Sequence, residues 1–149
     1  MAFQKSVSIP GYGFTATYIR LDRIAYIDEL ARDAQFVFKL YADKTVAAQP
    51  GCQGFPAANV RFVTEAFDLY FSKAKLQAAG VSLHALVYKA VADFVEAKKA
   101  HDLHQAYLAD AANDPAKAPT VTPDQETLVR CVLFPATMLP DIFVGATNV

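Results

Sequence analysis

Residues 15–24, TATYIRLDRI, and residues 35–43, QFVFKLYAD, decide the fold of this chain. Apolar and polar side chains alternate along both stretches. One face of the first has Thr17, Ile19 and Leu21, and one face of the second has Phe36, Phe38 and Leu40. A period of two with β-branched and aromatic residues is typical of half-buried strands. The two stretches therefore predict two long strands, each with one face on a core and a wetter face outside.

Further strands are predicted on either side of this pair. The strand-like runs are residues 6–9, residues 60–71 with a bulge or a change of sheet near Glu65, and residues 127–134. Residues 28–33 connect the two long strands, and residues 50–56, PGCQGFP, form an irregular loop because proline and glycine interrupt regular structure. These runs predict a sheet built from sequential, antiparallel strands.

The period changes to that of a helix after a short helical turn at residues 72–79, which ends at Gly80. Apolar residues recur every three or four positions over residues 82–99, with Ser82 as the N-cap, and the helix has room to continue to about Ala112. One broad apolar stripe is what a helix needs to cover one face of a sheet. We therefore expect an α+β fold, an antiparallel sheet of about four to six strands packed against one long amphipathic helix.

The 149 residues are enough for a single domain, and we expect residues 1–149 to form one. Residues 113–123, NDPAKAPTVTP, have three prolines and few large apolar groups, which predicts an exposed loop or arm. The C-terminal stretch MLPDIFVGATNV is strongly apolar. It is expected either to enter the core of its own domain or to pack against a neighbouring subunit.

Composition excludes several classes of protein. The net charge of −1 argues against a nucleic-acid-binding protein, which needs a clustered basic excess. Apolar stretches are too short for a membrane span, and the N-terminus has no apolar run typical of a signal peptide. Cys52 and Cys131 are predicted to be free thiols, with a disulfide as the alternative.

No residue pattern indicates catalysis or a bound cofactor. His101 and His104 share a helix face but lack the further ligands that a zinc site requires, and His84 is expected to be a partly exposed packing residue. Gly11 and Gly13 indicate a turn rather than a phosphate loop. Carboxylates near the first long strands alternate with arginines and lysines, which favours solvated ion pairs over an acid–base pair. We expect no catalytic, metal or cofactor site, no small-molecule substrate and no enzymatic activity.

Four stretches of sequence resemble a group of short virion structural proteins of tailed bacteriophages, from tail or baseplate gene modules. They are the opening MAFQKSVSIP, the strand ATYIRLDRI, the strand FVFKLYADKTVA and the closing LPDIFVGATNV. The pattern covers residues 1–45 and 135–149. The longer helical region and the proline-rich arm depart from the compact members of that family.

The resemblance implies a subunit located in the virion and assembled in the host cytoplasm. It implies contacts with copies of itself and with other virion proteins, and no cofactor. The residues expected to make these contacts lie in the arm and in the apolar tail: Pro115, Pro119, Val121, Pro123, Leu139, Ile142, Phe143 and Val144.

Two alternatives remain open at the level of sequence. A capsid decoration, or cement, protein has the same profile of a building block. A sheet curved around one helix can also enclose an apolar pocket for a small ligand. In that case the pocket would be lined by Phe36, Phe38, Phe67, Phe71, Tyr88 and Phe94.

Overall fold

The computed structural model describes residues 1–9, 11, 13, 15–135 and 141–149, and has the predicted α+β fold. Its strands are β1 (Phe3–Ser8), β2 (Thr15–Asp28), β3 (Asp33–Tyr41), β4 (Phe55–Val63), β5 (Val132–Leu133) and β6 (Thr147–Asn148). Its helices are α1 (Lys44–Ala47), α2 (Thr64–Tyr70), α3 (Lys73–Ala78), α4 (Leu83–Ala109) and α5 (Pro123–Cys131), with a 3-10 turn η1 (Pro115–Lys117).

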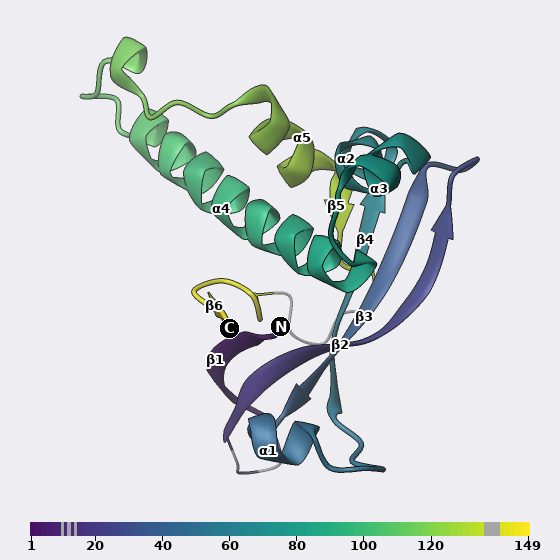
Figure 1. Ribbon diagram of the computed structural model, residues 1–149. Helices are drawn as coiled ribbons and strands as arrows, with labels where there is room; N and C mark the ends of the chain where they lie inside the picture. Colours follow the sequence, from purple (N-terminus) through teal and green to yellow (C-terminus); the bar gives the residue numbers. More distant parts are fainter. Residues whose placement is uncertain (10, 12, 14, 136–140) are drawn as a thin grey trace.

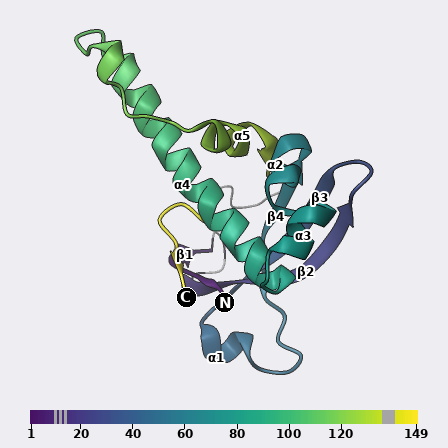
Figure 2. The same ribbon diagram turned by 45° about the horizontal axis from the view of Figure 1, so that its top comes forward.

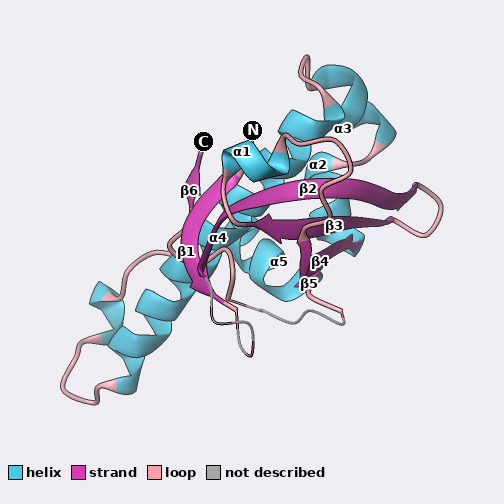
Figure 3. Ribbon diagram, turned by 90° about the horizontal axis from the view of Figure 1, so that it is seen from below, coloured by secondary structure: helices cyan, strands magenta, loops and turns pink. Residues whose placement is uncertain are grey.

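The six strands form one antiparallel sheet in the order β5-β4-β3-β2-β1-β6. The strands make one curved layer with α4 and α5 on one side of it (Figure 3). The N-terminal and C-terminal strands are neighbours, because β1 pairs with β6 and Ala2 exchanges two backbone hydrogen bonds of 2.8 Å with Val149. Both chain ends therefore lie side by side at the β1 end of the sheet (Figure 1).

The predicted alternation of β2 and β3 is confirmed. Ile19 and Leu21 of β2 are buried, as are Phe36, Phe38 and Leu40 of β3. On the other face Lys39 pairs with Asp22 at 3.0 Å, and Arg61 pairs with the mostly buried Asp33. The charged side chains along these strands thus form the expected ion pairs on the wetter face.

Two irregularities bend β2. The register against β3 shifts between Leu21 and Arg23 and again between Ile24 and Tyr26. Each β-bulge adds one residue and increases the local twist. As a result, the inward-facing positions of β2 change from odd to even and back, and the strand curls around the core.

Helix α4 covers the face of the sheet on which these apolar residues lie (Figure 1). Ser82 is its N-cap, as predicted, since its Oγ accepts a hydrogen bond from the Ala85 N–H at 3.2 Å. The buried residues of α4 end at Ala97. The remaining turns extend beyond the sheet, as two views show (Figures 1 and 2).

The aromatic residues proposed to line a ligand pocket form part of the core instead. Phe36, Phe38, Phe67 and Phe71 are fully buried, and the rings of Phe36 and Phe71 lie 4.8 Å apart. Tyr88 stacks edge-on against Phe38 at 5.9 Å. These rings contact one another, so they contribute packing energy to the interior.

The predicted strand over residues 60–71 is wrong in its second half. Strand β4 ends at Val63, and residues 64–70 form α2. Thr64 has a left-handed backbone (φ 49°) and starts the turn between them. Phe67 and Phe71 are four residues apart, which places them on one face of a strand and equally on one face of a helix.

The predicted strand over residues 127–134 is also wrong. Residues 123–131 form α5, and only Val132 and Leu133 continue as a strand. Leu128 and Cys131 are buried one helical turn apart. The proline-rich segment ahead of α5 is largely exposed, as predicted for the arm, and contains the 3-10 turn η1.

Two smaller differences concern element bounds. The first strand is Phe3–Ser8 rather than residues 6–9. The segment before the Pro50 loop contains α1, whose N-cap Asp43 accepts a hydrogen bond from the Val46 N–H at 2.9 Å. No helix among the described residues is long and apolar enough to cross a membrane.

Candidate functional site

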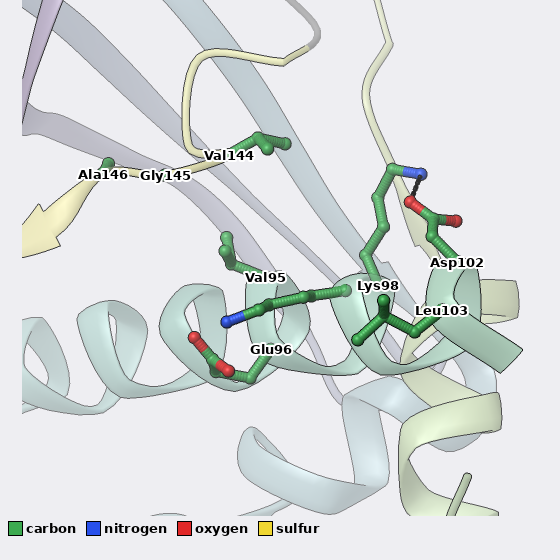
Figure 4. Close-up of a pocket in the computed structure, with 9 residues that line it drawn as sticks. Val95, Glu96, Lys98, Asp102, Leu103, Val144, Gly145 and Ala146 are labelled. Atoms are coloured by element: carbon green, nitrogen blue, oxygen red, sulfur yellow. Dashed lines mark hydrogen bonds and ion pairs between the residues drawn. The ribbon is translucent and has the colours of Figure 1, made fainter. Parts of the chain in front are cut away.

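An open groove runs along α4, between this helix and the C-terminal segment, and we call it the α4 groove. It has a volume of about 490 Å³. One wall is α4 and the other is the segment that leads into β6 (Figure 4). Its lining residues are Val95, Glu96, Lys98, Lys99, Asp102, Leu103, Val144, Gly145 and Ala146.

The second wall of the groove is a turn held against the sheet. Ile142 and Phe143 insert into the core, and Phe143 packs on Phe3 and Phe38 with ring centroids 5.2 and 5.1 Å away. Gly145 has a φ of +73°, a conformation that favours glycine, and lets the chain turn back toward β6. Val144 is thereby left half-exposed opposite Val95 (Figure 4).

Apolar side chains dominate the walls, and charges lie at the rim. Leu103 is 55% exposed and Val144 46% exposed, so both offer apolar surface to a partner. Lys98 donates a hydrogen bond of 2.9 Å to Asp102, and this bond lowers the pKa of the Asp102 carboxyl. Apolar walls with charged edges resemble the anatomy of protein–protein contacts.

A smaller hollow of about 230 Å³ continues the α4 groove toward α5. It shares Val95, Lys98 and Val144 with the groove and is otherwise lined mainly by apolar residues, among them Val129 and Phe134. The two hollows adjoin along α4, because Val95, Lys98 and Val144 line both of them.

The predicted contact residues are divided between the core and the surface. Ile142 and Phe143 are buried in the chain's own core, so the self-burial alternative describes them. Val144 lines the groove. Leu139 lies outside the described residues.

The predicted arm residues lie apart from the groove. Pro115, Pro119 and Pro123 are exposed, and Val121 is partly buried. Two side-chain hydrogen bonds attach the arm to α4: Asn113 Nδ2 donates to the Tyr107 carbonyl oxygen at 3.0 Å, and the Nδ1–H of His104 donates to the Pro119 carbonyl oxygen at 2.7 Å. Pro123 is the first residue of α5, a position that proline favours because its missing N–H is not needed there.

Cys52 and Cys131 are free, and Cys131 is buried beside Thr64 and Glu65. His84 is exposed. His101 lies 3.7 Å from Asp102, and the described residues contain no group of three His, Cys, Asp or Glu side chains that could hold a metal ion.

Sequence reasoning missed most of the groove. Val95 belongs to the apolar stripe of α4 and was expected to face the sheet, whereas it is only partly buried at the base of the groove. Leu103 lies beyond this stripe, and the sequence does not mark it as a contact residue, because single apolar residues are common on protein surfaces.

No family model, no curated protein and no solved structure matches this chain.

Proposed function

We propose that this protein is a non-enzymatic structural protein of a tailed-bacteriophage virion, an assembly subunit of the tail or baseplate. The observation that supports this most directly is the α4 groove. Its apolar walls are exposed, and one of them is built from the closing segment that resembles the virion family.

The two stretches that resemble the family are neighbours in space. Residues from the N-terminal stretch, Phe3 and Phe38, pack against Phe143 of the C-terminal stretch. Lys5 donates to the Asp141 carbonyl oxygen at 2.8 Å, which ties β1 to the turn before the groove. Because the N-terminal and C-terminal stretches contact each other, they belong to one structural unit. A family resemblance in two separated segments is expected to have such a common unit.

Exposed apolar groups at the groove favour a binding role. Contiguous apolar surface with a charged rim marks protein–protein interaction sites more often than random surface does. In the proposed role, side chains of a second copy or of another virion protein fill the groove. Leu103 and Val144 then become the apolar anchors of the contact.

A matched pair of substitutions on α4 tests this role. Leu103→Glu places a charge in the groove, whereas Leu108→Glu places the same charge at a leucine that is 41% exposed and does not line the groove. We expect the wild type and Leu108→Glu to form larger species as concentration rises in light-scattering measurements. Leu103→Glu should stay smaller while its urea unfolding midpoint is unchanged.

Labelling of purified particles tests the location. Antibody against this protein, carried on gold, should mark the tail or baseplate in electron micrographs. Label on the head would instead favour the capsid decoration alternative. A monodisperse monomer that binds an apolar dye and never labels a particle would overturn the assembly role and favour a ligand-binding domain.

A further inference from the structure

A second hollow, of about 480 Å³, lies away from the α4 groove, between β2, α1 and the first turn of α4. Its lining differs in chemistry from that of the groove because polar and basic groups predominate. The groups used below are Tyr88 of α4, Arg20 and Asp22 of β2, Lys44 of α1 and His84 of α4.

Tyr88 provides a buried hydrogen-bond donor in this pocket. The residue is 2% exposed, and its hydroxyl oxygen accepts the Leu21 N–H at 2.7 Å. Among the described residues, the hydroxyl proton has no recorded acceptor. Burial raises the pKa of the Tyr88 phenol, so the group stays neutral and keeps that proton. A phenol can accept one hydrogen bond and still donate one, so this donor is available to a ligand.

Arg20 supplies a positioned cation. Its Nη1 donates to the Ala47 carbonyl oxygen at 2.9 Å, which ties the guanidinium of β2 to the end of α1. That bond uses one of the five N–H donors of a guanidinium. Lys44 and His84 are exposed residues of the same lining and add basic character at the rim.

One acidic group, Asp22, also lines the pocket, and its charge is compensated. Its carboxylate pairs with Lys39 at 3.0 Å. The balance of charge among Arg20, Lys44 and the Asp22–Lys39 pair is therefore positive. An anion entering the pocket would meet more attraction than repulsion.

The N-terminus of α4 faces the same pocket through Ser82, His84 and Ala85. Ser82 caps the Ala85 N–H, whereas the N–H groups of Leu83 and His84 belong to the first turn and have no acceptor within the helix. A helix of 27 residues has a positive partial charge at this end, which adds to the effect of the side chains.

We infer that this pocket binds a small oxyanion of phosphate type, with the Tyr88 hydroxyl, the Arg20 guanidinium and the first turn of α4 as its donors. The site uses no residue of the α4 groove. Its failure would leave the proposed assembly role intact, and the converse also holds.

Titration with inorganic phosphate at constant ionic strength tests the inference, with two-dimensional amide NMR spectra recorded at each phosphate concentration. We expect saturable shifts of the Leu83, His84 and Leu21 amides. Arg20→Gln should weaken binding by about tenfold, because a charge-assisted hydrogen bond is lost. Lys44→Ala should weaken it less, and Lys75→Ala, on exposed α3 and outside the pocket, should bind as the wild type does.

Tyr88→Phe removes the buried hydroxyl and so tests its role as a donor to the anion. If loss of the hydrogen bond to the Leu21 N–H destabilises the fold of this variant, Arg20→Gln still tests the site. Potassium chloride at matched ionic strength is the control for general screening. Shifts that grow linearly without saturation, or that fall equally in Arg20→Gln and Lys75→Ala, would overturn the inference.

Discussion

Among single residues, Phe143 is the anchor of the C-terminal segment. It is 1% exposed and packs against the rings of Phe3 and Phe38. Phe143→Ala should lower the free energy of unfolding by about 3–5 kcal/mol, because the lost ring leaves a cavity among side chains that cannot fully collapse. Urea unfolding followed by circular dichroism measures this.

The adjacent Val144 is the matched control for Phe143. It is 46% exposed, so Val144→Ala should change the free energy of unfolding by less than about 0.5 kcal/mol. Equal effects of the two substitutions would contradict the division of this segment into a buried anchor and an exposed groove wall.

Glu65 links α2 to α5 and makes a pH-dependent contribution to the stability of the fold. Hydrogen bonding by the Thr64 side chain, with further help from the Cys131 thiol at 3.4 Å, lowers the pKa of Glu65 to about 2. The unfolded chain therefore binds the proton more readily than the folded protein does. The contribution to stability is complete above about pH 4.5 and is lost as pH falls toward about 2.

Glu65→Gln should remove that part of the acid dependence. Urea midpoints measured between about pH 7 and pH 3 should fall less steeply for Glu65→Gln than for the wild type, since the amide does not titrate over this range. Glu126→Gln, at an exposed position of α5, is the control and should retain the wild-type slope. Identical slopes for the wild type and Glu65→Gln would contradict the lowered pKa.

At the scale of elements, α5 depends on its N-terminal cap. Thr122 accepts the Gln125 N–H at 3.2 Å, and the Gln125 side chain accepts the Thr122 N–H at 2.9 Å. Thr122→Ala should cost about 1 kcal/mol of stability in thermal or urea unfolding, a typical value for a lost cap. Thr120→Ala, two residues earlier in the arm, should cost little, and equal losses would contradict the capping role.

The same cap explains one error of sequence interpretation. The motif Thr122-Pro-Asp-Gln125 combines a capping box with proline at the first helical position, both of which mark the start of a helix. The apolar run that follows has high β propensity, which by itself predicts a strand. Local cap chemistry was the better signal, since propensity in a short run is easily overridden by tertiary contacts.

No comparable signal in the sequence distinguishes α2 from the strand that was predicted there. Phe67 and Phe71 satisfy both the strand and the helix period, and both are buried in the structure. The left-handed conformation at Thr64, which ends β4, is unusual for a β-branched residue and has no signature in the sequence. By contrast, β2, β3 and α4 were predictable because each repeats one period over many residues.

At the scale of the molecule, the α4 groove could not be predicted because it depends on where a distant segment lies. Its α4 wall follows from the helix, but its second wall is fixed by two β1–β6 residue pairs and by the insertion of Phe143. Pairings this short have no periodic signal. The sequence indicated that the tail would be buried or would bind a neighbour, and the structure combines a buried anchor with an exposed wall.

The continuous core leads to a prediction for the whole chain. The buried core is continuous from Phe3 in β1 through Phe38 in β3 and Val91 in α4 to Leu128 in α5 and Phe143. Because β1 to β4, α2, α4 and α5 contribute to one core, we expect the chain to unfold as a single cooperative unit. Far-UV circular dichroism, which reports helices, and near-UV circular dichroism of the tyrosines should show coincident urea transitions.

The substitution Phe143→Ala provides a stricter test of cooperative unfolding. If the chain is one unit, the substitution at the C-terminal anchor should move the far-UV and near-UV midpoints by the same amount, although α4 and α5 make up much of the far-UV signal. If α4 and α5 formed a separate unit, the far-UV transition would keep its wild-type midpoint while the tyrosine signal shifted. That separation would contradict a single domain, because a core shared by β1 to β4, α2, α4 and α5 transmits the loss of Phe143 to each of them.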